Sequence, residues 1–287
     1  MKRIIHVIAL LTIPALASIM CSATFADSPL RSPEAMVALR ARAVAGEIAA
    51  IAELGATLQN DKDQANDIEG RDLLIKAVDA GWWPSAYFLA QSYLYGWSDW
   101  ARLDGEANFS EGLKWLRHAG EIAPPDAVAQ DVYRLLGQIY SGFPVKGTMW
   151  PDTPVDEAEA TKWYRLCALE LDPFCEWQLG RLLIKSPESA VEGVKWLLSA
   201  ANAGHEYPMS ALAELYETGT VLKKDLEKAV IWRERSTRWG VTVSGRTEFE
   251  ARARNKIAEL SKQLTPEQLA RAMEIAGQFK PSTPGWH

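Results

Sequence analysis

A tryptophan-centred helical frame recurs along the chain and constrains its fold more than any other feature. In segment 191–204, Trp196 is followed by alanines at the fourth and fifth positions and by Gly204 at the eighth. Related copies, in which an aromatic or leucine residue precedes small residues by about one turn, are centred on Leu73, Trp115, Trp163 and Trp232. Residues one turn apart share a face of an α-helix, and glycine commonly ends one. The chain is therefore predicted to contain five related helices.

A second pattern, small-x-x-Leu-[Gly/Ala]-x-x-Tyr-x-x-Gly, precedes the later copies of the first. Its best instances lie at 86–96 and 209–219, with weaker ones at 133–142 and 176–185. The leucine, small residue and tyrosine form one stripe of a 3.6-residue helix. Successive tryptophans of the first frame are 48, 33 and 36 residues apart, which is typical of solenoids whose hairpins bury their faces against their neighbours. Together the patterns predict an all-α solenoid of antiparallel helix hairpins.

The segment 211–240 resembles the Sel1-like repeat family, which is related to the tetratricopeptide repeats. The family pattern A-x-x-L-G-x-x-Y-x-x-G-x-G-V-x-x-D-x-x-K-A-x-x-W is matched here by Gly219, Val221, Asp225, Lys228, Ala229 and Trp232. The resemblance covers about residues 70–240. It implies a right-handed superhelical solenoid that serves as a binding platform for other proteins.

The N-terminal residues have the pattern of an export signal. Two basic residues precede the apolar run 4–20, and small residues lead up to Ala26. We predict cleavage after Ala26 and a soluble periplasmic chain with no transmembrane segment after cleavage. Lipidation at Cys21 is the less favoured alternative, because two bulky residues precede this cysteine where small ones are required.

The chain is predicted to form one elongated body after the signal. The predicted parts are a signal peptide (1–26), an N-terminal capping helix and loop (27–69), the repeat solenoid (70–240), C-terminal capping helices (241–280) and a loose tail (281–287). The N-terminal capping helix is expected to run from Pro33 to Leu58. Two C-terminal helices are expected at about 246–262 and 266–279, the second capped by Thr265.

Two cysteines remain after the signal. Cys167 lies near the end of one predicted helix and Cys175 at the start of the next, with the turn Asp172-Pro173 between them. An oxidising compartment favours a disulfide between them. The cysteine-rich secreted branch of the Sel1-like family uses the same spacing, and this resemblance implies the same bond. Two free buried thiols are the alternative, whereas a redox-active pair is disfavoured because no C-x-x-C motif is present.

Two long loops in successive repeats, 97–107 and 142–155, occupy a connection that is short in the later repeats. Loops of this length are commonly functional. They supply five large apolar side chains that helix packing does not require: Trp97, Trp100, Phe143, Met149 and Trp150. We expect both loops to emerge on the same edge, and aromatic and methionine side chains are favoured at interfaces. These five residues are therefore predicted to bind a partner. The alternative is that they cover gaps between hairpins.

No catalytic, metal or cofactor motif is recognisable in the sequence. Zincin, nucleophile-elbow and phosphate-loop patterns are absent, and the histidines after the signal are isolated from one another: His118, His205 and His287. A carboxylate group near one loop offers a weak calcium site, although acids at a helix start are the favoured explanation: Asp152, Asp156, Glu157 and Glu159. We predict neither catalytic residues nor a cofactor or metal.

These features favour a non-enzymatic protein-binding module in the periplasm. A formal charge of −6 without a basic stripe argues against nucleic acid as a partner. The resemblance to the family implies, as its sharpest expectation, an immunity protein that neutralises a secreted toxic effector such as a lipase. An envelope-signalling regulator or a secretion or surface adaptor is the alternative. The second alternative is a ligand- or glycan-binding role in the concave groove, suggested by twelve tryptophans, or a hydrolytic enzyme with polar residues converging in the same groove.

Overall fold

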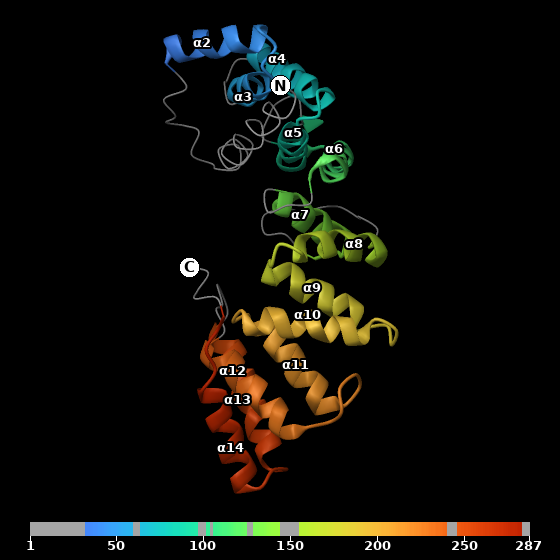
Figure 1. The fold of residues 1–287 in the computed structure, drawn as a ribbon, viewed down its shortest axis with the longest axis vertical. Coiled ribbons are helices and arrows are strands. Elements are labelled where there is room, and N and C mark those ends of the chain that lie inside the picture. Colours follow the sequence, from blue (N-terminus) through green and yellow to red (C-terminus); the bar gives the residue numbers. More distant parts are fainter. Residues whose placement is uncertain are drawn as a thin grey trace, which may run out of the picture. The chain divides into compact units, whose positions relative to one another are not determined.

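A computed structural model describes residues 32–59, 64–96, 102–103, 106–124, 129–143, 155–239 and 246–282. The predicted signal peptide lies outside these ranges. The described residues form thirteen helices and one two-stranded ladder (Figure 1), so the all-α prediction is confirmed. None of these helices has the length and apolar character needed to cross a bilayer. The chain divides into two compact units, Met1–Pro154 and Val155–His287.

The first unit consists of consecutive helix pairs. Its elements are α2 (Pro33–Val44), α3 (Ile48–Leu58), α4 (Gln64–Asp79), α5 (Trp83–Tyr95), β1 (Arg102–Leu103), β2 (Glu106–Ala107), α6 (Phe109–Ile122) and α7 (Gln130–Tyr140). Helix α3 packs on α4, and α5 packs on α6. Strands β1 and β2 pair antiparallel. The connection between α5 and α6 therefore contains a short β-ladder.

The segment predicted as one helix from Pro33 to Leu58 instead forms two helices, α2 and α3. The break falls at Gly46, whose φ of 87° lies in the left-handed region that ends helices. Helix α3 is apolar on nearly all sides, with every residue from Leu54 to Leu58 buried, and such a helix needs neighbours on more than one face. It obtains them from α2 and α4.

Helices α3 and α4 form a repeat-like hairpin, although α3 was predicted to be part of a cap. Leu54 and Gly55 stand where later units have Leu-Gly or Leu-Ala, and Leu58 stands where they have tyrosine. A Cβ atom added at Gly70 of α4 would lie 2.7 Å from the Gly55 carbonyl oxygen. The hairpin architecture therefore begins before residue 70.

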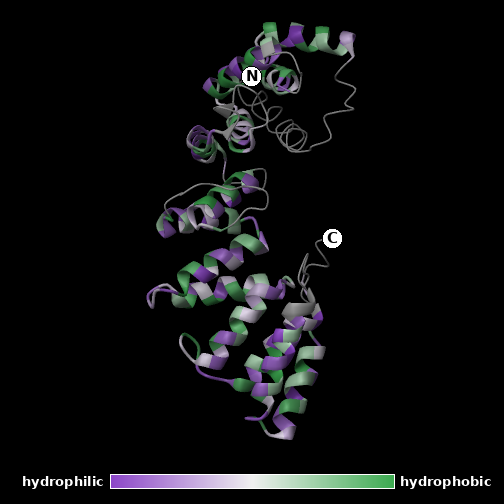
Figure 2. Cartoon of the chain, turned by 180° about the vertical axis from the view of Figure 1, so that it is seen from behind, coloured by the Kyte–Doolittle hydropathy of each residue, from purple (hydrophilic) through white to green (hydrophobic). Residues whose placement is uncertain are grey.

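The second unit continues the same arrangement and ends in a three-helix packing. Its helices are α8 (Glu157–Ala168), α9 (Pro173–Leu183), α10 (Ala190–Asn202), α11 (Glu206–Thr218), α12 (Leu226–Trp239), α13 (Arg246–Ser261) and α14 (Pro266–Gly277). Each of α8 to α11 packs on the next helix, and α12 packs on both α13 and α14. Hydrophobic and hydrophilic residues are interspersed along these helices (Figure 2), as expected where one face is buried.

The tryptophans of the repeated frame differ in burial. Trp163 and Trp232 are buried, at 1% and 7% exposure, whereas Trp115 and Trp196 are partly buried. The position three residues before each frame residue is small and buried in all five copies: Gly70, Gly112, Ala160, Gly193 and Ala229. Small side chains there allow the paired helix to approach closely, so the distance between paired helices is set by the residue about one turn before each frame residue.

The C-terminal helices begin and end close to their predicted boundaries. Thr265 caps α14 as predicted, and its side chain and that of Gln268 form a reciprocal capping box. The tail predicted to be loose is partly docked, because the Ser282 backbone N–H donates to the Asn202 carbonyl oxygen at 2.8 Å. The prediction of a loose tail is therefore wrong for Ser282. Residues 283–287 lie outside the described ranges.

Candidate functional site

The structure places one of the five predicted partner-binding residues. Trp97, Trp100, Met149 and Trp150 lie outside the described residues. Phe143 follows α7 and is partly buried, and its backbone N–H donates to the Gln138 carbonyl oxygen at 3.0 Å. The binding of a partner by the five apolar side chains of the two loops therefore stays a prediction.

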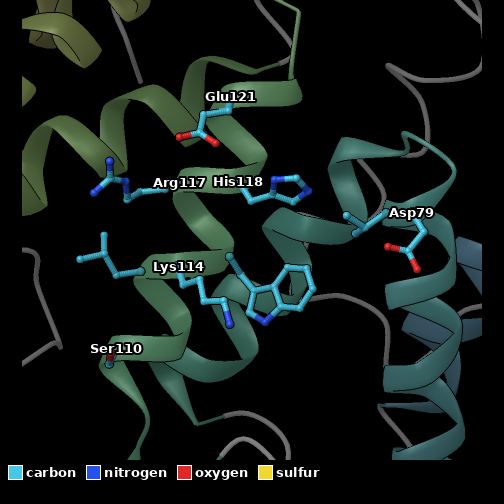
Figure 3. Close-up of a pocket in the computed structure, with 9 residues that line it drawn as sticks. Asp79, Ser110, Lys114, Arg117, His118 and Glu121 are labelled. Carbon is cyan, nitrogen blue, oxygen red and sulfur yellow. The ribbon is translucent and has the colours of Figure 1, made fainter.

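A pocket of about 700 Å³ lies in the first unit between the end of α4 and one face of α6 (Figure 3). It is lined by Val78, Asp79, Ser110, Leu113, Lys114, Trp115, Arg117, His118 and Glu121. The His118 side chain extends from α6 toward the α4 side of the pocket, where Asp79 stands (Figure 3). The lining combines an aromatic and aliphatic surface with side chains of both charges.

Helical periodicity gathers these side chains on one face of α6. Ser110, Lys114, Arg117 and Glu121 follow at steps of three or four residues, which places them in one row. The opposite face is occupied by α5, because a Cβ atom at Gly112 would lie 2.7 Å from the Leu94 Cγ. Because α5 packs against one side of α6, the opposite side, which carries Lys114, Arg117 and Glu121, is free to line the pocket.

The side chains of the pocket are suited to binding. The Trp115 and His118 rings meet edge to face at 6.3 Å, and the Arg117 guanidinium lies 5.9 Å from the centre of the Tyr140 ring. Lys114 is paired with Glu111 at 3.4 Å, although its side chain is 72% exposed. Tryptophan and arginine are the residues most often found at interface hot spots, so the pocket has the composition of a protein contact.

The pocket does not bring Ser110 to His118. Eight residues along α6 separate these two lining residues, which is about 12 Å at 1.5 Å per residue. General-base activation of a hydroxyl requires hydrogen-bond reach. Ser110 and His118 are therefore not placed as a nucleophile and its base.

The two cysteines are bonded as the sequence predicts. Cys167 at the end of α8 and Cys175 in the first turn of α9 form a disulfide with their Cα atoms 5.8 Å apart, and both are fully buried. The carboxylate of Asp172 lies close to the two sulfurs and accepts a hydrogen bond from the Cys175 backbone N–H at 2.9 Å. The bond therefore closes the turn between the two helices, and Asp172 caps the second.

The carboxylates considered for calcium have partners within the protein. Asp156 caps α8 by accepting from the backbone N–H groups of Ala158 and Glu159, each at 3.0 Å. Glu157 pairs with Lys185, and the Glu159 carboxylate accepts from the Trp163 indole at 2.9 Å. Asp152 lies outside the described residues. The placed carboxylates fit the helix-start interpretation favoured by the sequence.

Sequence reasoning missed the pocket as a site. Its signal was present, because Ser110, Lys114, Arg117 and Glu121 form a polar row beside the frame residue Trp115. A polar row beside a core position is ordinary for an amphipathic helix. Only the position of α4, which supplies Asp79, turns this row into one wall of a pocket.

Comparisons with known proteins agree with the hairpin fold. The Sel1 repeat model matches residues 83–121, 146–169, 174–205 and 209–237. In the described residues, three of these segments coincide with the hairpins α5–α6, α9–α10 and α11–α12, and the remaining one contains α8. A search of the curated proteins finds no match.

The solved structures that resemble the chain include two Sel1-type repeat proteins. One is a protective antigen present in uropathogenic Escherichia coli strains and displaying an SLR fold, with 21% identity and a TM-score of 0.53 over 86% of this chain and 48% of that one. The chain thus spans about half of that antigen's length. The other is a Sel1 repeat protein from Oxalobacter formigenes, with 20% identity and a TM-score of 0.55 over 94% of this chain and 99% of that one. The family match shows that the chain contains Sel1 repeats between residues 83 and 237, and the two solved structures share its fold.

Proposed function

We propose that this protein is a non-enzymatic scaffold that binds a protein partner in the periplasm, and that the pocket between α4 and α6 is part of its contact surface. The observation that carries the proposal is the partly exposed Trp115 of α6. Lys114, Arg117 and His118 line the pocket beside it on the same helix, and Asp79 lines it from α4. A preformed surface of this kind loses little conformational entropy on binding.

The chain connects this pocket directly to the first aromatic loop. Strand β2 ends at Ala107, Asn108 caps α6 by accepting from the Glu111 backbone N–H at 3.1 Å, and Ser110 already lines the pocket. Ser110 follows Trp100 by ten residues, so the first aromatic loop, with Trp97 and Trp100, precedes the pocket closely in the sequence. We include both tryptophans in the proposed contact surface, together with Phe143, Met149 and Trp150 of the second loop.

The finer proposal is an immunity role toward a secreted toxic effector such as a lipase. Its support is the export pattern at the N-terminus, the repeat fold, and a pocket lined by aromatic and charged side chains. An envelope-signalling regulator or a secretion or surface adaptor would use the same surface on a different partner. The identity of the partner separates these roles, so the test begins with the product of the neighbouring gene.

The first experiment co-expresses that gene product in the periplasm with and without this protein and measures growth and the Kd of the complex. An immunity protein restores growth and binds directly. Charge reversal by Lys114→Glu with Arg117→Glu is expected to raise the Kd tenfold or more, which is about 1.4 kcal/mol. The control is Lys195→Glu, on the exposed face of α10. Absence of protection and of binding contradicts the immunity role, and an equal effect of the control contradicts the pocket.

A second pair of variants tests the loops. Replacing Trp100 and Trp150 by alanine should raise the Kd by at least tenfold while Tm is maintained, because interface residues contribute to the complex and not to the free fold. A lower Tm with an unchanged Kd would instead show that the loops cover the protein itself, as in the alternative interpretation of the sequence.

A further inference from the structure

Three side chains of the types that bind metals come together in the turn between α8 and α9. The sulfurs of Cys167 and Cys175 and a carboxylate oxygen of Asp172 all lie within 4.8 Å of one another. The two cysteines are eight residues apart in the chain, which is wider than the two to four intervening residues common in zinc motifs. The turn therefore assembles a ligand set that the sequence does not predict.

The backbone positions suit a metal ion as well as a disulfide. In a tetrahedral site with zinc–sulfur bonds of about 2.3 Å, the two sulfurs stand about 3.8 Å apart. The cysteine Cα atoms are 5.8 Å apart, and rotation of the two side chains can provide this separation once the S–S bond is broken. A zinc-bound sulfur and carboxylate oxygen stand about 3.6 Å apart, so small side-chain shifts complete the site.

Asp172 can act as a ligand without losing its structural role. Its carboxylate caps α9 by accepting from the Cys175 backbone N–H at 2.9 Å. A carboxylate has two oxygens with about four lone pairs, so this hydrogen bond leaves capacity for a metal. Asp172 is 2% exposed, and a buried negative charge is costly unless a positive charge compensates it. A cation in the turn would supply such compensation.

The ligand types favour Zn²⁺. Thiolates select Zn²⁺ and Cu⁺, whereas a carboxylate is a hard ligand that adds little for Cu⁺. Zn²⁺ accepts both sulfur and carboxylate oxygen. His205 is outside the group, so the three protein ligands leave the fourth position of the tetrahedron to water.

The turn offers a route to the buried sulfurs. Cys167 and Cys175 are fully buried, whereas Leu169 and Leu171 between them are 59% and 74% exposed. Local opening of an exposed segment costs less free energy than global unfolding. A reductant and a metal ion can therefore reach the sulfurs while the helices stay folded.

We propose that reduction of the Cys167–Cys175 bond converts this turn into a Zn²⁺ site with Cys167, Cys175 and Asp172 as ligands. A dithiol supplies the two electrons through two thiol–disulfide exchanges: the S–S bond of the protein breaks, and the dithiol leaves as a cyclic disulfide. The protein sulfurs become thiols, and Zn²⁺ binds them as thiolates while two protons pass to solvent. This redox-dependent site goes beyond the proposed binding function and does not depend on it.

The test adds Co²⁺, as a coloured substitute for Zn²⁺, to the full chain reduced without oxygen by a phosphine, because a dithiol would itself bind the metal. We expect one Co²⁺ per reduced chain, with the ultraviolet charge-transfer band of a cobalt–thiolate bond, and displacement by Zn²⁺. Asp172→Asn retains a capping side chain and should raise the Kd at least tenfold. Asp156→Asn is the matched control, since Asp156 caps α8 in the same way and is outside the group.

Thermal unfolding shows whether the metal binds the folded protein. Zn²⁺ should raise the Tm of the reduced wild type, because a ligand of the folded state stabilises it. It should leave the Tm unchanged for the oxidised protein and for the variant with both cysteines replaced by serine.

Four results would overturn the site. They are absence of the cobalt–thiolate band, wild-type affinity in Asp172→Asn, the same loss in Asp156→Asn, and binding that does not raise the Tm of the reduced protein. Wild-type affinity in Asp172→Asn would mean that two thiolates alone hold the metal. Partner binding is measured separately through Lys114 and Arg117 in the first unit, so either proposal can fail while the other stands.

Discussion

Gly180 of α9 and Gly193 of α10 face each other where their helices cross, and neither position has room for a methyl group. A Cβ atom at Gly180 would lie 2.8 Å from the Gly193 carbonyl oxygen, and one at Gly193 would lie 2.9 Å from the Gly180 carbonyl oxygen. Gly55 and Gly70 make the same mutual approach in the first unit. Hairpins in both units are therefore held at backbone contact by glycines in matching positions.

Substitution of Gly180 by alanine should destabilise the second unit. The added methyl group meets backbone, which cannot move without shifting a helix, and overpacking of this kind lowers the free energy of unfolding by about 1–3 kcal/mol. Gly277→Ala is the control, because its nearest neighbour is the flexible end of Arg238 at 3.1 Å. Urea denaturation monitored by tryptophan fluorescence measures the free energy of unfolding of both variants. If Gly180→Ala were as stable as Gly277→Ala, the close crossing would be contradicted.

Loss of the disulfide should destabilise the protein without unfolding it at room temperature. The bond closes a short loop between residues eight apart, for which the chain-entropy model gives about 2–3 kcal/mol. Guanidinium denaturation with and without a dithiol reductant measures the difference. The variant with both Cys167 and Cys175 replaced by serine should match the reduced wild type and should not respond to the reductant. Detection of two free thiols in the purified wild-type protein would exclude the bond.

The buried carboxyl group of Glu176 should give stability a pH dependence. Burial raises the pKa of Glu176 above 4.5, the Ser199 hydroxyl opposes this change, and Asp172 adds to it. A raised folded pKa means that the folded state binds the proton more tightly than the unfolded state does. The contribution to stability is therefore complete below the unfolded pKa and is lost as pH rises through the folded pKa.

The variant Glu176→Gln keeps an acceptor for Ser199, whose hydroxyl donates to Glu176 at 2.7 Å, and removes the ionisation. Its free energy of unfolding should increase relative to that of the wild type as pH rises from about 4 to 7. Glu188→Gln should show the opposite trend, because the Ser186 hydroxyl lowers the pKa of Glu188. Parallel pH profiles for wild type and Glu176→Gln would show that Glu176 does not titrate as stated.

The sequence alone determined the hairpin fold, because its signals depend on residues within a few positions of one another. The spacing from Trp196 to Gly204 predicts a helix and its end, and Thr265 with Pro266 predicts the start of α14. The disulfide could be predicted for the same reason, since Cys167 and Cys175 lie on either side of one short turn.

The tertiary structure alone decided how each copy of the frame is used. Trp163 and Trp115 occupy the same frame position, yet the first is buried and the second lines a pocket, because burial depends on which helices lie against the residue and not on its own helix. Helix α3 has Leu58 where the second sequence pattern has tyrosine, so only its packing between α2 and α4 identifies it as half of a hairpin. The left-handed conformation of Leu171 likewise could not be predicted from the sequence, because a positive φ is normally adopted by glycine and here occurs within the turn that the disulfide closes.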